Sequence, residues 1–136
     1  MSLELRKINV TIQSSPILRS IDLYVGPGER VGLIGRNGAG KTTTMRTIAG
    51  LAKPVSGEVM FDGKSITAMS PDERALLGFG YMPEDRRLVP LLTVEENMLL
   101  PAWVNKNIDG PARLKIVYDL MPELTSMKSR KALQLS

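Results

Sequence analysis

The sequence predicts an α/β fold, with strands in its first half and helices in its second half. Two N-terminal runs, residues 3–12 and 17–25, are rich in β-forming residues. A short apolar run at residues 30–34 leads into a glycine-rich loop and then into a helical pattern. Helix start signals recur after residue 70. At this length the order of these signals predicts one domain, or part of a larger one.

The composition excludes several classes of protein. The 136 residues have a formal net charge of +4 and include neither Cys nor His. Without Cys there is no disulfide or thiolate metal site, and without His the commonest general base and zinc ligand are missing. The N-terminal residues MSLELRKINV carry charges where a signal peptide needs an apolar run. No apolar stretch approaches the ~18 residues of a membrane span, so we expect a cytoplasmic protein that meets a membrane only through a partner.

The first three predicted elements are strands. Residues 3–12 mix β-forming residues with charges, and in residues 17–25 the apolar Ile21, Leu23 and Val25 alternate. Residues 30–34 (RVGLI) follow a Gly-Pro-Gly turn and form a short apolar run. Such a run is typical of a strand that is buried on both faces.

A helix and a hairpin come next. Residues 41–51 predict a helix that closes near Gly50 and ends before Pro54. The strands of the hairpin are residues 57–62 and 64–66, which meet at Asp62-Gly63, a dipeptide typical of a two-residue turn.

A second helix and a further strand follow the hairpin. Ser70 as N-cap, Pro71 at the first helical position and two acids in the first turn predict a helix that runs to about Leu77. Residues 78–82 are predicted as a short buried strand that ends at Pro83.

Two more helices are predicted in the last third of the chain. Thr93, with Glu96 three residues later, forms a capping box that opens a helix, and we expect Pro101 to end or kink it. Residues 111–121 predict a helix with one apolar face, formed by Leu114, Val117, Leu120 and Met121.

The motif that carries chemistry is G-x-x-x-x-G-K-[ST], a phosphate-binding loop. Its glycines let the backbone turn with several N–H groups aimed inward, and the following helix N-terminus attracts anions. Lys41 reaches the β- and γ-phosphates, and the Thr42 hydroxyl is placed to bind Mg²⁺. The motif predicts a nucleoside triphosphate with Mg²⁺, bound by Gly35, Arg36, Asn37, Gly38, Ala39, Gly40, Lys41, Thr42 and Thr43.

The segments around this loop resemble, in chain order, the nucleotide-binding subunit of an ATP-binding cassette (ABC) transporter. They are ILRSIDLYVGPGERVGLIG, LIGRNGAGKTTTMRTIAGL, PVSGEVMFDGKSI and GFGYMPEDRRLVPLLTVEEN. The segment LVPLLTVEENMLL resembles the corresponding segment in the cassettes of branched-chain amino acid importers. The resemblance implies a P-loop NTPase fold of the ABC cassette type, with an antiparallel β-subdomain and a partial α-helical subdomain, and with the C-terminal strands missing.

The resemblance also implies further site residues. Glu84 stands where the family's Q-loop has the Gln that contacts Mg²⁺ and water, so it is a candidate catalytic and metal-binding residue; the alternative is an exposed loop acid. The position of the family's adenine-stacking aromatic falls on Ile12 or Thr11, and Ile12 is the candidate base contact. In residues 83–101, where the family docks its permease, Arg86 and Arg87 either contact the permease or are solvated loop charges.

The resemblance divides the chain into residues 1–83, the nucleotide-binding core with its β-subdomain, and residues 84–136, the Q-loop and part of the helical subdomain. Its partners would be a transmembrane permease and a second cassette in a head-to-tail dimer, on the cytoplasmic face of the membrane. ATP and Mg²⁺ would be the cofactors. No nucleic acid is expected, because the basic run 128–131 is short and has no neighbouring aromatics.

The family's signature, LSGGQ, begins at Leu135-Ser136, where the sequence stops. The expected apolar strand ending in Asp-Glu is absent, so we expect no appreciable ATP hydrolysis by residues 1–136 alone, and we expect residues 31–34 to lack a strand partner and promote aggregation. Two other functions stay open: a non-hydrolysing nucleotide-binding module, and an ABC protein that acts on ribosomes or in DNA repair.

Overall fold

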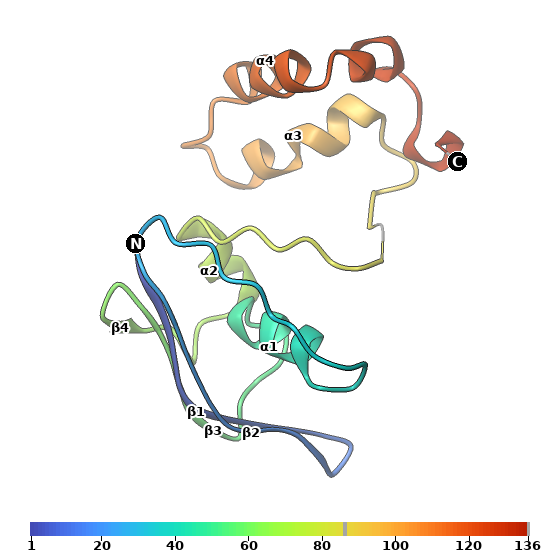
Figure 1. The fold of residues 1–136 in the computed structure, drawn as a ribbon. Helices are drawn as coiled ribbons and strands as arrows, with labels where there is room; N and C mark the ends of the chain where they lie inside the picture. Colours follow the sequence, from blue (N-terminus) through green and yellow to red (C-terminus); the bar gives the residue numbers. More distant parts are fainter. Residues whose placement is uncertain (86, 136) are drawn as a thin grey trace. The chain divides into compact units, whose positions relative to one another are not determined.

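The computed structural model describes residues 1–85 and 87–135, and the chain forms two compact units, Met1–Met82 and Pro83–Ser136 (Figure 1). The first contains all the named strands and two helices, and the second is helical.

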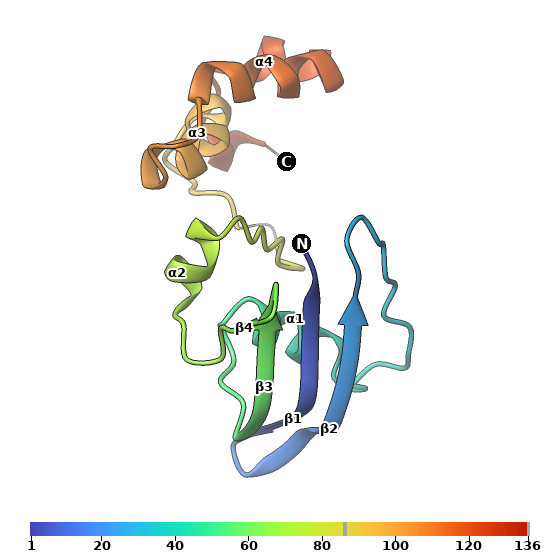
Figure 2. The same ribbon diagram turned by 90° about the vertical axis from the view of Figure 1, so that its left-hand side faces the viewer.

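The first unit is built on a four-stranded antiparallel sheet with the order β2-β1-β3-β4 (Figure 2). The strands are β1 (Leu3–Ile12), β2 (Ser15–Val25), β3 (Ser56–Phe61) and β4 (Lys64–Ser65). The two predicted N-terminal strands and the hairpin around Asp62-Gly63 are confirmed. The hairpin turn has positive φ at both central residues, as a two-residue turn requires.

A bulge in β1 sets which side chains reach the core. Lys7 has φ +45°, and its amide donates over 2.8 Å to the side-chain carboxylate of Asp22 on β2 rather than to a backbone carbonyl. The extra residue shifts the alternation, so that Leu5, Ile8 and Val10 are all buried. Gly57 lies against this bulge with φ +93°, and a Cβ there would collide with the carbonyl oxygens of β1. The bulge therefore fixes which face of β1 is apolar.

The core of this unit lies between the sheet and the helix α1 (Lys41–Ile48). Its buried side chains come from β1, β2, β3, α1 and the residue after β4: Leu5, Ile8, Val10, Leu18, Ile48, Val59 and Ile66. The helix is three residues shorter than predicted, because the chain turns at Gly50 with φ +80°. Helix α2 (Pro71–Leu76) begins at Ser70 with the predicted cap, and Ser70 and Glu73 form a full capping box.

Two predicted strands of the first unit are wrong. Residues 30–34 and 78–82 have no strand structure, Ile34 is 99% exposed and Met82 is 92% exposed. An apolar run becomes a buried strand only when neighbouring strands pair with both of its edges. Within residues 1–85 and 87–135 no strand pairs with either run. Val31, Leu33, Ile34 and Met82 are therefore exposed, whereas Phe79 packs on Phe61 at the edge of the core.

The second unit contains helices α3 (Val94–Val104) and α4 (Gly110–Leu120) and two short 3₁₀ turns, Pro122–Met127 and Ala132–Gln134. Thr93 and Glu96 form the predicted capping box. Of the two effects expected of Pro101, a helix end is wrong and a kink stays a prediction: α3 runs three residues beyond Pro101, and the Asn105 amide donates to the Pro101 carbonyl at its end. The predicted apolar face of α4 is only partly covered, since Leu120 is 77% exposed.

The two helices are joined by a hydrogen bond of 2.7 Å from the Tyr118 hydroxyl to the Glu95 carboxylate. Burial of the ring, with the Glu95 charge, raises the pKa of Tyr118 to about 12. None of the helices described is long and apolar enough to cross a membrane.

Candidate functional site

The glycine-rich loop at residues 35–40 leads directly into α1 and is solvent-exposed up to Gly40. Gly38 and Gly40 have φ of +81° and +87°, in the left-handed region that other residues rarely adopt. A hydrogen bond of 3.1 Å from the Ala39 amide to the Arg36 carbonyl closes a turn inside the loop. The loop is therefore wrapped in front of the helix, which is the geometry that the motif predicts.

Gly40 fixes the loop against the sheet. It is buried, and a Cβ at this position would lie 2.6 Å from Cδ2 of Leu18 on β2. Both the positive φ and this close approach require a residue without a side chain. The start of α1 is thus seated on the same sheet that carries the core.

The N-terminus of α1 has no side-chain cap and no acid in its first turn. In contrast, α2, α3 and α4 are capped by the side chains of Ser70, Thr93 and Asp109. The first amides of a helix have no carbonyl partner within the helix, and together with the helix dipole they attract an anion. Here this end of α1 lies directly behind the glycine loop.

Lys41 curls back over the loop. Its Nζ donates hydrogen bonds to the carbonyl oxygens of Gly35 over 2.7 Å and of Arg36 over 2.9 Å. An ammonium group has three donors, so one N–H is left for an anion held by the loop. The lysine both shapes the loop and places a positive charge at it.

Among the threonines of α1, two serve the helix and two are available to a ligand. The hydroxyls of Thr44 and Thr47 donate to the carbonyls one turn back, those of Gly40 and Thr43. Over the described ranges the hydroxyls of Thr42 and Thr43 form no hydrogen bond, and Thr42 is exposed. This difference agrees with the predicted roles of Thr42 toward Mg²⁺ and Thr43 toward phosphate.

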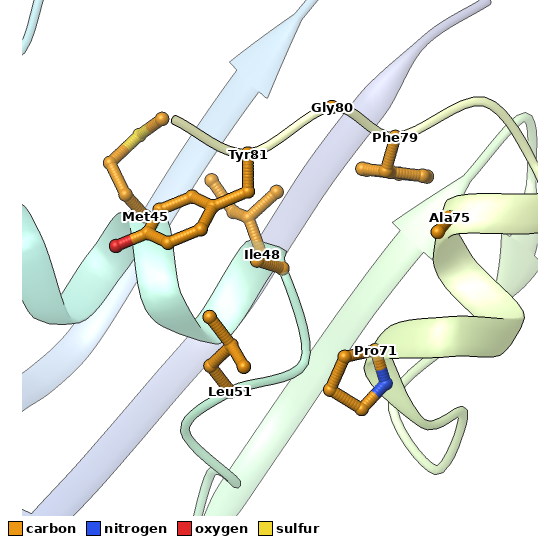
Figure 3. Close-up of a pocket in the computed structure, with 9 residues that line it drawn as sticks. Met45, Ile48, Leu51, Pro71, Ala75, Phe79, Gly80 and Tyr81 are labelled. Atoms are coloured by element: carbon orange, nitrogen blue, oxygen red, sulfur yellow. The ribbon is translucent and has the colours of Figure 1, made fainter. Parts of the chain in front are cut away.

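The largest cavity described near α1 is a different feature. It has a volume of about 260 Å³ and lies at the C-terminal half of α1, facing α2 and the segment after it (Figure 3). Its lining is almost entirely apolar: Met45, Ile48, Ala49, Leu51, Pro71, Ala75, Phe79, Gly80 and Tyr81. No cationic side chain lines it, so it is unsuited to a phosphate group.

The predicted site residues outside the glycine loop are Ile12 and Glu84, with Arg86 and Arg87 as candidate permease contacts. Ile12 ends β1 in the first unit and is 44% exposed. Glu84 is exposed and belongs to the second unit. Arg87 forms an exposed ion pair of 2.7 Å with Asp85. Arg86 and Ser136, the last residue of the predicted signature start, lie outside the described residues.

Sequence reasoning missed two organising residues. The Arg74 side chain is 1% exposed and donates to five backbone carbonyls, those of Thr47, Ile48, Ile66, Thr67 and Met69. The Asn97 side chain bonds the backbone of the loop before α3. The only sequence signal was a polar residue inside a predicted helix, which does not separate a buried polar group from a solvated one.

Comparison with known proteins places this geometry in a family. The family model described as ABC transporter matches residues 18–136. The probable branched-chain amino acid transport ATP-binding protein LivF of Archaeoglobus fulgidus is 34% identical over 130 residues, which cover 96% of this chain and 55% of that protein. The lipopolysaccharide export system ATP-binding protein LptB of Haemophilus influenzae is 33% identical, over 82% of this chain and 46% of that protein.

A solved structure agrees with the sequence relatives. The dimeric ATP-binding cassette MJ0796, in a post-hydrolysis state bound to ADP and Pi, matches 98% of this chain and 63% of its own with a TM-score of 0.82 and 27% identity. The chain spans about half the length of the curated relatives it matches. By its sequence, its fold and its glycine loop, the chain belongs to the ABC transporter ATPase family.

Proposed function

We propose that this chain is the ATP-binding part of an ABC transporter subunit, and that it holds Mg-ATP at residues 35–43. The observation that carries the proposal is the combination at α1: a glycine loop in left-handed conformation in front of a helix N-terminus that no side chain caps. The relatives named above are ATP-binding proteins of transport systems, and MJ0796 was solved with ADP and Pi.

The roles of the loop residues follow from their contacts. The amides of residues 36–38, 40 and 41 would donate to the phosphate oxygens, and the third N–H of Lys41 would add a charged bond. The hydroxyl of Thr42 would bind Mg²⁺, which supplies charge neutralisation when bound, and that of Thr43 would bond a phosphate oxygen. Ile12 would pack on the purine, more weakly than an aromatic ring would.

Hydrolysis and transport are proposed for the complete cassette. Phosphoryl transfer depends mainly on positioning and charge stabilisation, and Glu84 is our candidate for a Mg²⁺ contact from the Q-loop. We assign residues 1–83 to the nucleotide-binding core and residues 84–136 to the Q-loop and helical subdomain. We expect residues 1–136 alone to bind nucleotide with negligible turnover.

The partners and the transported substrate are also proposals. We infer that residues 83–101 dock a transmembrane permease on the cytoplasmic face of the membrane, and that a second cassette completes a dimer. Branched-chain amino acids are the substrate class we favour, because a LivF protein is 34% identical over nearly the whole chain. The relation to LptB, named for lipopolysaccharide export, supports the view that the permease, not the cassette, selects the substrate.

The test is calorimetric titration of the 136-residue chain with Mg-ATP. Lys41→Ala should weaken binding at least tenfold, because it removes the positive charge and loosens the loop. Lys53→Ala is the matched control, since Lys53 is an exposed lysine outside the loop. Equal affinities for the two variants would contradict the proposed site, and rapid phosphate release by the wild-type chain would contradict the absence of turnover.

A further inference from the structure

The loop before α3, residues 88–93, is held in place by one side chain. Oδ1 of Asn97 accepts a hydrogen bond of 2.8 Å from the Val89 amide. Its Nδ2 donates to the carbonyls of Val89 over 3.1 Å and Thr93 over 2.9 Å, with a longer contact to Leu92. A single amide group therefore spans the loop from its beginning to its end.

The same loop and the first two residues of α3 also pair with a distant segment, residues 128–133. The amides of Val94 and Glu95 donate to carbonyls at 130 and 128 over 2.9 and 3.1 Å. In return, the amides of Ala132 and Leu133 donate to carbonyls at 92 and 90 over 2.9 and 3.0 Å. A β-bridge joins Thr93 to Lys131 at the centre of this exchange.

This junction is also where the second unit is most completely buried. Val94 and Ala132, each 7% exposed, are the buried apolar side chains described in residues 83–135. By contrast, Leu88, Val89 and Leu91 on the other side of the loop are 48%, 41% and 72% exposed. The loop thus exposes apolar side chains to solvent while its backbone is hydrogen-bonded to segment 128–133.

We propose that Asn97 is a positioning residue that makes the loop 88–93 and the segment 128–133 move together as one rigid body. A displacement of the exposed loop is then passed to the residues that follow the segment. This inference rests on the proposed function, in which the loop belongs to the docking region for the permease and Leu135 begins the signature sequence. In that setting Asn97 links partner docking to the placement of the signature.

The test is amide hydrogen exchange of the full 136-residue chain, resolved by residue. Asn97→Ala should raise the exchange rates of Ala132 and Leu133 by at least tenfold, while the amides of α4 keep their rates. Asn107→Ala is the matched control, because Asn107 is an exposed asparagine whose amide side chain bonds no described residue. Faster exchange in the loop with unchanged rates at Ala132 and Leu133 would overturn the proposal.

Two further variants separate coupling from a general loss of structure. Asn97→Asp keeps the acceptor for the Val89 amide and loses the donors, so it should give an intermediate increase at Ala132 and Leu133. Thr93 and Lys131 form a non-hydrogen-bonded pair, whose short separation suits a disulfide, and the chain has no native Cys. Adding Thr93→Cys and Lys131→Cys to Asn97→Ala should restore slow exchange when oxidised.

Uniform acceleration of all amides in the second unit, α4 included, in both Asn97 variants would make Asn97 a general fold determinant and would also overturn the proposal. The readout needs no nucleotide, so its result is independent of the Lys41→Ala titration. Failure of the proposed function would therefore appear in the titration alone, and failure of the coupling in the exchange rates alone.

Discussion

Nη1 of Arg74 donates a hydrogen bond of 2.7 Å to the carbonyl oxygen of Ile48, the last residue of α1. The same nitrogen bonds the Thr47 carbonyl over 2.8 Å, which also accepts from the Gly50 amide, so a buried cation bonds the last two carbonyls of the helix. Burial lowers the pKa of the guanidinium below its ordinary value. The helix that carries the glycine loop at one end is thus anchored at its other end by Arg74.

The anchoring of α1 by Arg74 leads to a first prediction, on the stability of the Arg74→Ala variant. Arg74→Ala leaves several carbonyls of residues 47–69 buried without a donor, and we expect a loss of about 3 kcal/mol in the free energy of unfolding of the first unit. Urea denaturation followed by circular dichroism measures it. Arg46→Ala is the control, because Arg46 is an exposed arginine of α1, the helix that Arg74 anchors, and should change stability by less than about 0.5 kcal/mol. Similar losses in the two variants would contradict the anchoring role.

The local elements of this fold could be predicted from sequence because their signals are local. Ser70-Pro71 and Thr93 with Glu96 determine helix starts through contacts three residues apart, and Asp62-Gly63 determines a hairpin turn. The glycine loop could likewise be located, because its geometry depends on the glycines themselves.

The errors occur where structure depends on distant partners. Residues 30–34 and 78–82 are apolar enough for buried strands, but burial requires strands on either side, and none pairs with them in the described part of the chain. The role of Arg74 was missed for the same reason. It depends on carbonyls up to 27 residues away, which no local pattern encodes. Whether Ile12 and Glu84 meet the nucleotide stays a prediction for the same reason.

The hydrogen bond from Tyr118 to Glu95 predicts alkaline sensitivity of the second unit. The pKa of Tyr118 is raised from 10 to about 12, so the folded state binds the phenolic proton more tightly than the unfolded state. The stabilisation is complete below pH 10 and is lost as the pH rises toward 12. Trp103, the chain's one tryptophan, reports unfolding of this unit by fluorescence.

Tyr118→Phe removes the titrating group and provides the control for this pH range. We expect it to cost about 1 kcal/mol at neutral pH, since it leaves the Glu95 carboxylate without its donor. Its stability should then change less between pH 10 and pH 12 than that of the wild type. Parallel pH profiles for the two proteins would show that the hydrogen bond does not govern alkaline unfolding.

The capping box of α3 predicts acid sensitivity. Bonds from the Thr93 amide and hydroxyl lower the pKa of Glu96, so the folded state favours the carboxylate. The stabilisation is present above pH 4.5 and is lost as the pH falls through the lower, folded-state pKa. Glu96→Gln keeps a side chain that can form the box without a titrating proton. Its Trp103 unfolding midpoint should therefore depend less on pH between 5 and 3 than that of the wild type, and an equal dependence would count against this cause.

Gly40 offers the sharpest test of the loop geometry, because Gly28 is a natural control. Both have positive φ, +87° and +73°, but a Cβ at Gly28 meets no atom within 4 Å, whereas one at Gly40 would lie 2.6 Å from Leu18 Cδ2. Gly28→Ala should cost only the left-handed strain, about 1–2 kcal/mol. Gly40→Ala adds a collision with the sheet and displaces the start of α1, so it should cost more and also weaken Mg-ATP binding at least tenfold. Thermal unfolding and calorimetric titration of both variants make the comparison. If the two alanines behave alike in both measurements, the seating of Gly40 on Leu18 does not shape the site.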